Sequence, residues 1–175
     1  MAPRLTSLLT CGLLLLSLPW LAGGSELVVP GLGLYEYADP NFEGMRLILT
    51  QRGEAYSAAY IQGLSGSAFR MAGPCPCAPT CSRAMTPTEL AERLGYMVEE
   101  LGLPGGQAEV NAAAPAVVTR VKQALREGQS ALVWSAFSNA EWDVVCGADE
   151  ESDEFLGRSS YSFLGMPDLD RKSVV

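Results

Sequence analysis

Residues 131–158 read ALVWSAFSNAEWDVVCGADEESDEFLGR, and this stretch decides the fold. Three runs rich in valine and aromatic residues, Ala131 to Phe137, Trp142 to Cys146 and Phe155 to Arg158, are typical of β-strands. The acidic segment from Ala148 to Asp153 separates the second run from the third and suits a hairpin turn. The pattern predicts an antiparallel sheet in the C-terminal half of the chain.

Helical patterns come before these strands. Asp39 followed by Pro40 is typical of a helix cap with proline at the first helical position. Thr86-Pro87-Thr88-Glu89 has the form of a capping box, and Pro115 precedes apolar residues at helical spacing. We therefore predict four helices, over about residues 41–51, 56–62, 87–94 and 115–127.

Helices followed by an antiparallel sheet place the chain in the α+β class. Two shorter runs, Ala68 to Met71 and Tyr96 to Leu101, are predicted as further strands. The Gly- and Ala-rich segment 103–114 is predicted as a surface connection.

The composition is that of one globular domain. The chain has 175 residues, of which 48% are hydrophobic and 18% are charged. Its net charge of −8 repels phosphate backbones, so we expect no nucleic-acid partner. After the first 24 residues no apolar stretch approaches the length of a membrane span, so we expect no stable span in the mature chain.

The N-terminus has the order of a secretory signal. Arg4 precedes an apolar run from Leu8 to Leu18, and small residues follow from Ala22. We expect a signal peptide over 1–24, a linker over 25–34 and the folded domain over 35–169. The protein would then be exported, to the periplasm or the extracellular space. The alternative is a spurious extension from an upstream start codon, which would leave the protein cytoplasmic.

The last six residues, Asp170 to Val175, resemble the translation of a common sequencing-adapter stretch. We interpret 170–175 as a non-native tail and keep it out of the fold prediction. On this interpretation the natural chain continues beyond Leu169 and the domain is truncated at its C-terminus.

Four cysteines follow the leader, Cys75, Cys77, Cys81 and Cys146, in a chain without histidine. Without imidazole there is no Ser-His-Asp or Cys-His catalysis and no His-ligated zinc. Four thiolates fit a zinc or iron–sulfur site, whereas an oxidising compartment favours two disulfides. The alternatives of disulfides or inert thiols, a metal site, and a redox or nucleophilic thiol all stay open.

A nucleophilic thiol needs a lowered pKa and a nearby base. Cys81 lies shortly before the predicted helix at Thr86, and Cys77 is the second candidate thiol. The nearest candidate bases are Glu141 and Asp143. The competing interpretation is structural: one of these two carboxylates faces solvent and the other hydrogen-bonds a loop.

Two segments of the chain resemble a known family. Phe42 to Phe69 contains Met-Arg-Leu-Ile-Leu and a Gly-Leu-Ser-Gly-Ser-Ala-Phe run, and Glu141 to Asp149 follows the strand Ala131 to Trp134 as Glu-Trp-Asp-Val-Val-Cys-Gly-Ala-Asp. Together they resemble the butirosin-biosynthesis H-type N-terminal domain, which is related to C39-like, papain-fold cysteine peptidases. The resemblance spans roughly 35–160 and implies a papain-like α+β fold.

The resemblance does not extend to catalytic residues. Where the family places its nucleophilic cysteine, at the first helix N-terminus, this chain has Pro40-Asn41-Phe42, and where it places the histidine, this chain has Glu141. No catalytic residue of the family therefore carries over, and the resemblance implies a pseudoenzyme.

We therefore predict a non-catalytic binding or regulatory module that takes a small molecule or a peptide and needs no cofactor. Its cleft should lie between the first helix and the sheet, near Asn41, Trp134, Glu141 and Trp142. One alternative is a cysteine-dependent acyl or amide transferase or hydrolase with a relocated nucleophile, Cys81 or Cys77. Another is a zinc, iron–sulfur or redox site built from the four cysteines.

Overall fold

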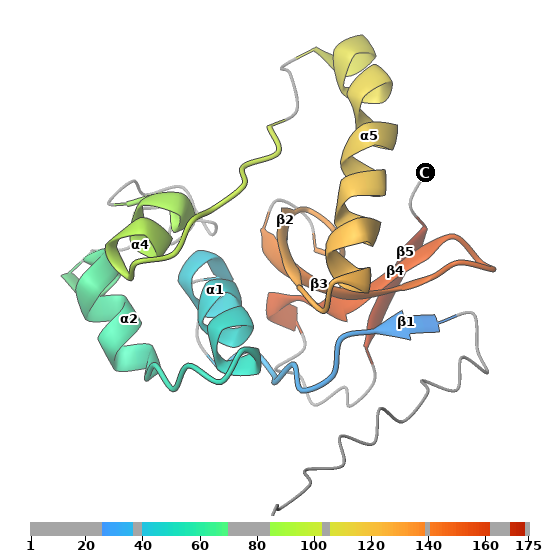
Figure 1. Ribbon diagram of the computed structural model, residues 1–175. Coiled ribbons are helices and arrows are strands. Elements are labelled where there is room, and N and C mark those ends of the chain that lie inside the picture. Colours follow the sequence, from blue (N-terminus) through green and yellow to red (C-terminus); the bar gives the residue numbers. More distant parts are fainter. Residues whose placement is uncertain are drawn as a thin grey trace, which may run out of the picture.

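The computed structural model describes residues 26–36, 40–69, 85–102, 106–138, 141–161 and 169–173. In this part of the chain four α-helices and an antiparallel sheet confirm the predicted α+β class (Figure 1). The helices are α1 (Pro40–Gln51), α2 (Ala58–Ser65), α4 (Pro87–Arg93) and α5 (Gln107–Arg126), with a short 3-10 helix η1 (Ser67–Phe69). The strands are β1 (Glu26–Val28), β2 (Ala131–Trp134), β3 (Trp142–Asp149), β4 (Glu154–Arg158) and β5 (Asp170–Ser173).

Strand β3 is the centre of the sheet. On one side it pairs with β4, which in turn pairs with β5. On its other side two short strands follow one another, β2 along Trp142 to Val145 and β1 along Gly147 to Asp149. All of these pairings are antiparallel, and a bulge between Val145 and Gly147 shifts the register with β4.

The two faces of the sheet are covered by different helices. Val145 of β3 lies in one apolar cluster with Val121 and Leu125 of α5. Val144, its neighbour in the strand, lies in another cluster with Leu47 of α1. Because successive side chains of a strand point to opposite faces, α5 covers one face and α1 the other.

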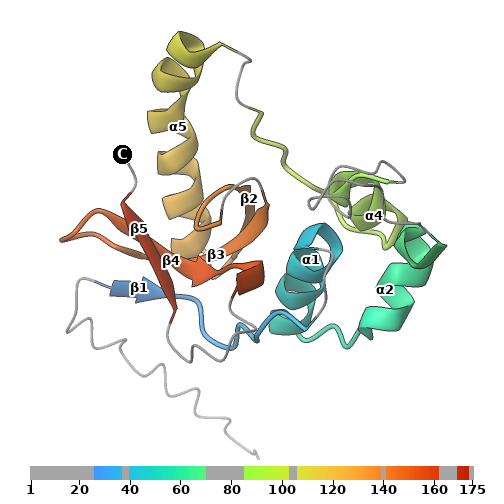
Figure 2. The ribbon, with the colours of Figure 1, turned by 180° about the vertical axis from the view of Figure 1, so that it is seen from behind.

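Helix α1 is the central helix of the molecule. In both views it lies between the α2–α4 pair and the sheet (Figures 1 and 2). Phe42 and Met45 pack with Ile61 of α2 and Leu90 of α4, while Leu47 packs toward the sheet. A helix that is enclosed on both sides buries most of its circumference, so its side chains must be apolar or must have polar partners. Most side chains of α1 meet that condition.

Several boundaries differ from the prediction. Helix α5 begins at Gln107 rather than at Pro115. Alanines 112–114 favour a helix, and Pro115 lies in the exposed N-terminal half of α5. Strand β2 ends at Trp134 because Ser135 takes a positive φ of 55°.

Two strand predictions are wrong. Tyr96 to Leu101 forms no regular element: Tyr96 packs against the apolar cluster of α1, α2 and α4, the residues after it are exposed, and no strand in the described chain pairs with them. Residues 68 and 69 belong to η1, and residues 70 and 71 lie outside the described ranges.

The two ends of the described chain add strands to the sheet. Strand β1 lies inside the range predicted as a linker, and β5 lies inside the range interpreted as a non-native tail. Glu26 of β1 and Arg171 of β5 form an ion pair across the sheet.

Gly44 determines how closely α1 approaches the sheet. A Cβ at this position would come within 2.6 Å of Leu132 Cδ1 and 2.7 Å of Tyr35 Oη. We predict that Gly44→Ala lowers the free energy of unfolding by about 1–3 kcal/mol, because α1 must move or the two side chains must change rotamer. Urea unfolding monitored by circular dichroism measures this change.

Gly63 in α2 provides the matched control, since a Cβ there meets no atom within 4 Å. Gly63→Ala should leave stability unchanged or raise it by about 1 kcal/mol through helix propensity. Equal effects of the two substitutions would show that α1 is not held at the distance described.

Candidate functional site

The orientation of α1 brings its N-terminus to one end of β2. At the other end of the helix, Gln51 Nε2 donates to the carbonyls of Val29 and Pro30, and Ser130 Oγ donates to Gln51 Oε1 at 2.6 Å. From Gln51 back to Asn41 the helix rises about 15 Å. Along β2 the distance from Ser130 to Trp134 is about 13 Å. From these lengths we infer that Asn41 lies near the level of Trp134.

Two tryptophans lie next to each other on this part of the sheet. Trp134 and Trp142 are register partners on β2 and β3, and their ring centroids lie 5.5 Å apart with the planes at 73°. They share the face of Leu132 and Val144, which is the face that α1 covers. Trp134 is 46% exposed, so part of its indole is available to a ligand.

Asn41 has an unsatisfied acceptor. Its residue is 8% exposed, and no described group donates to its Oδ1 atom. Gly44, one turn further along the helix, approaches Leu132 and Val144, so Asn41 lies on the sheet-facing side of α1. A buried amide oxygen without a partner is unfavourable, and a donor from a ligand would relieve that cost.

Tyr35 joins α1 to the tryptophan pair, although no sequence motif indicated it. Its hydroxyl donates to the carbonyl of Trp142 at 3.0 Å and lies against Gly44. Burial raises the pKa of Tyr35 far above its ordinary value, and the nearby carboxylates Asp143 and Glu43 raise it further. Tyr35 therefore stays a neutral hydrogen-bond donor.

A buried ion pair in the first turns of α1 was also missed. Arg46 donates to Glu43 through Nε at 2.8 Å and through Nη2 at 2.6 Å, and the backbone N–H of Glu36 donates to the same carboxylate. The i, i+3 spacing of Glu43 and Arg46 was the available signal. The pair neutralises two charges that α1 would otherwise bury alone.

Asp143 has a structural position. It is fully buried, and its Oδ2 accepts hydrogen bonds from Phe137 N at 2.7 Å and from Ser138 N and Oγ, both at 2.9 Å. Its strand partner Val133 packs with the α5 cluster, so Asp143 faces away from Asn41. Burial raises the pKa of Asp143, the bonds to Ser138 and Phe137 oppose that change, and Asp170 adds to it.

Glu141 lies just before β3 and is partly exposed. Its carbonyl accepts a hydrogen bond from Ser135 N at 2.7 Å, which continues the β2–β3 ladder. Of the four residues predicted to bind a ligand, the structure brings together Trp134 and Trp142, with Glu141 next to Trp142 in the chain, and it places Asn41 on the sheet-facing side of α1.

The cysteine predictions are divided by the described ranges. Cys75, Cys77 and Cys81 lie outside them. Cys146 is a free thiol on β3 with 1% exposure, and burial raises its pKa to about 11. Within the described ranges no group of three or more His, Cys, Asp or Glu side chains could hold a metal ion.

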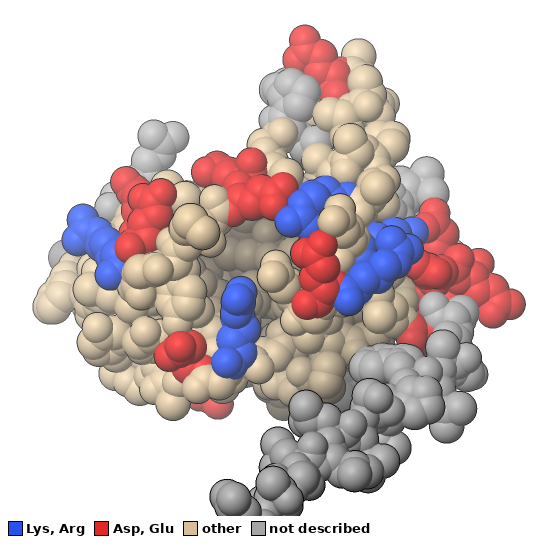
Figure 3. All heavy atoms as spheres, in the orientation of Figure 1, with Lys and Arg blue, Asp and Glu red and all other residues tan. Residues whose placement is uncertain are grey.

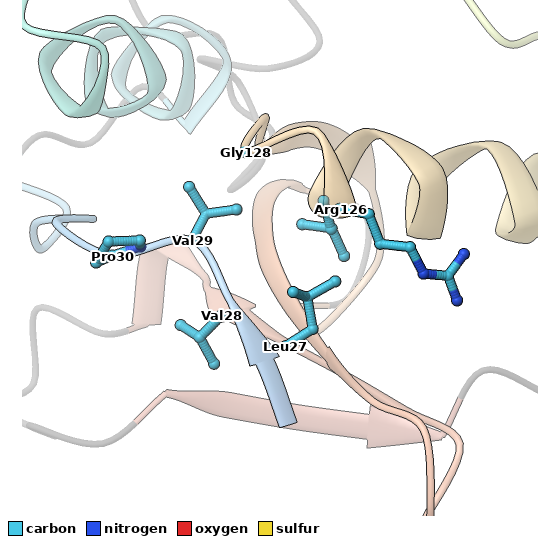
Figure 4. A pocket seen from close by; sticks show the side chains of 7 residues that line it. Leu27, Val28, Val29, Pro30, Arg126 and Gly128 are labelled. Carbon is cyan, nitrogen blue, oxygen red and sulfur yellow. The ribbon is translucent and has the colours of Figure 1, made fainter. Parts of the chain in front are cut away.

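Two hollows in the described part of the surface bear on the site. Figure 3 shows a hollow between the α1, α2 and α4 helices and the part of the molecule formed by α5 and the sheet, where Figure 1 draws α1 and β2 facing each other. A second hollow of about 370 Å³ lies between β1 and the end of α5 (Figure 4). Its lining is apolar apart from Arg126, whose guanidinium pairs with Glu150: Leu27, Val28, Val29, Pro30, Leu125, Arg126 and Gly128.

Comparisons of the chain with protein-family models, with curated proteins and with solved structures found no match. In the described ranges, no helix has both the length and the apolar character that crossing a membrane requires.

The raised pKa of Asp143 predicts a pH-dependent stability. The unfolded chain ionises this carboxyl at about pH 4, but the folded chain ionises it only at a higher pH. Asp143 therefore contributes stability below about pH 4 that is lost as the pH rises through its folded pKa. We expect the free energy of unfolding of Asp143→Asn, minus that of the wild type, to increase with pH over this window.

Urea unfolding at a series of pH values between about 4 and 7 measures this difference. Glu151→Gln, which removes one charge from the exposed hairpin turn, is the control and should show no comparable increase. A difference between Asp143→Asn and the wild type that stays constant or falls with pH would contradict the assignment.

Cys146 should resist alkylation in the folded chain. With a pKa of about 11, only about one thiol in a thousand is ionised at pH 8, and burial blocks access to that fraction. We expect iodoacetamide to modify Cys146 at least about 100-fold more slowly in buffer than in urea. Peptide mapping by mass spectrometry separates Cys146 from the other cysteines, and rapid modification in buffer would contradict its placement on β3.

Proposed function

We propose that this chain is a non-catalytic papain-like domain that binds a small molecule or a peptide. The binding site is the cleft between the N-terminus of α1 and the tryptophan pair of Trp134 and Trp142. One combination of observations supports this proposal: Asn41 Oδ1 is buried without a partner on the sheet-facing side of α1, and the face of the sheet that α1 covers presents a half-exposed indole.

The chemistry of the cleft favours binding. The exposed part of Trp134 offers a flat apolar surface that stacks on aromatic groups or peptide bonds, and Trp142 keeps the indole in place by its edge. Asn41 supplies an acceptor already out of water, so a donor from the ligand regains a full hydrogen bond there.

The residues of the cleft do not favour covalent catalysis. The chain contains no histidine, and Asn41 has neither a thiol nor a hydroxyl to act as a nucleophile. Of the two candidate bases, Asp143 hydrogen-bonds the loop at Ser138 and faces away from the cleft, and Glu141 lies just before β3.

Substituting Trp134 tests the site. We expect Trp134→Ala to weaken the binding of ligands at least about tenfold, because the stacking surface is lost. The ligands are found by saturation-transfer NMR with a set of aromatic amides and tripeptides, and their affinities are then measured by isothermal titration calorimetry.

Tyr161→Ala is the matched control, because Tyr161 is 50% exposed and Trp134 is 46% exposed. Ligands that bind both variants as they bind the wild type would place the site elsewhere. Turnover of a peptide or acyl ester that is abolished by Cys77→Ser or Cys81→Ser would contradict a non-catalytic function.

A further inference from the structure

The outer edge of β2 carries main-chain groups that point away from the sheet. Ser135 N donates to Glu141 O, so these two residues form a hydrogen-bonded pair. In an antiparallel ladder such pairs alternate, so Val133 with Asp143 is the next hydrogen-bonded pair. The residues between them, Leu132 and Trp134, therefore direct their N–H and C=O groups outward.

This edge is unpaired in the described chain. Strand β2 has β3 as its one strand neighbour there, and no described group hydrogen-bonds the main chain of Leu132 or Trp134 on the outer side. Two donors and two acceptors are therefore available along one short strand. An extended chain satisfies such groups by adding a strand.

The side chains at this edge fit the same occupant. Trp134 ends the strand, and its half-exposed indole lies on the α1 side, toward Asn41. A residue of an added strand opposite Trp134 would place its side chain about 5 Å away, against that indole. Aromatic and β-branched residues make the most favourable cross-strand contacts with tryptophan.

We propose that the free edge of β2 binds an extended peptide by strand addition, with an aromatic or β-branched residue packed against Trp134. The inference rests on the proposed function and narrows its ligand class from small molecule or peptide to peptide. The net charge of −8 favours neutral or basic peptides over acidic ones. Main-chain bonds to Leu132 and Trp134 supply affinity, and the cleft beside Asn41 supplies selectivity.

The test uses the intact chain and peptides with modified backbones. A library of random linear heptapeptides is selected on the immobilised protein, and the dissociation constants of the enriched peptides are measured by fluorescence anisotropy. Each peptide is then remade in two forms, N-methylated at its odd-numbered or at its even-numbered residues. In a strand only one of these two sets of N–H groups faces β2.

We expect one N-methylated form to bind at least about tenfold more weakly and the other to bind like the parent peptide. Trp134→Ala should weaken the parent peptide by a similar factor, and Tyr161→Ala should leave it unchanged. This pattern would support strand addition at β2.

The contrary outcomes separate the two proposals. Peptides that need Trp134 but bind equally in both N-methylated forms would overturn strand addition and leave the proposed cleft standing. Failure to enrich any peptide, while aromatic amides bind in a Trp134-dependent way, would likewise overturn strand addition and leave the proposed cleft standing. Peptides that bind regardless of N-methylation and of Trp134→Ala would overturn both.

Discussion

The contact between α1 and the sheet at Gly44 is the constraint on which the rest of the structure depends. The helix is enclosed by α2 and α4 on one side and by β2 and β3 on the other, and only a residue without a Cβ fits against Tyr35 and Leu132. This contact fixes the height of α1 along β2, as the bonds of Gln51 do at its other end. From both we infer the position of Asn41 opposite the tryptophans.

The polar groups around the site fall into two kinds, those that have hydrogen-bond partners in the described chain and those that have none there. The carboxylate of Asp143 holds the loop after β2, Tyr35 ties its hydroxyl to Trp142, and Glu43 neutralises Arg46 within α1. Each of these groups has a partner, Asp143 through its Oδ2 atom alone, and so serves stability and position. Asn41 Oδ1, on the opposite face of the sheet from Asp143, and the outer main chain of β2 have no partner among the described residues. Unsatisfied groups of this kind, gathered beside an exposed indole, are typical of a site that a ligand completes.

Part of this arrangement could be predicted from the sequence. The proline at the start of α1, the capping box at Thr86 and the β-rich runs locate α1, α4 and the sheet, because those signals are local. Pro115 indicates a helix start and so predicts too short an α5, because the alanines before the proline also support the helix. Side-chain alternation also implies that Trp142 and Asp143 face opposite sides of the sheet, so the two cannot line one cleft together. The role of Tyr35 depends on a contact 107 residues away, which no local pattern encodes.

Mapping a bound peptide by NMR chemical shifts tests the central claim, that α1 and the tryptophan pair together form the binding site. Two hollows on different parts of the surface make the result decisive. Binding in this cleft should shift the signals of the side-chain amide of Asn41, the indoles of Trp134 and Trp142, and the backbone amides of Leu132 and Trp134. Shifts centred instead on 27–30 and 125–128, the residues of the apolar hollow between β1 and α5, would contradict it.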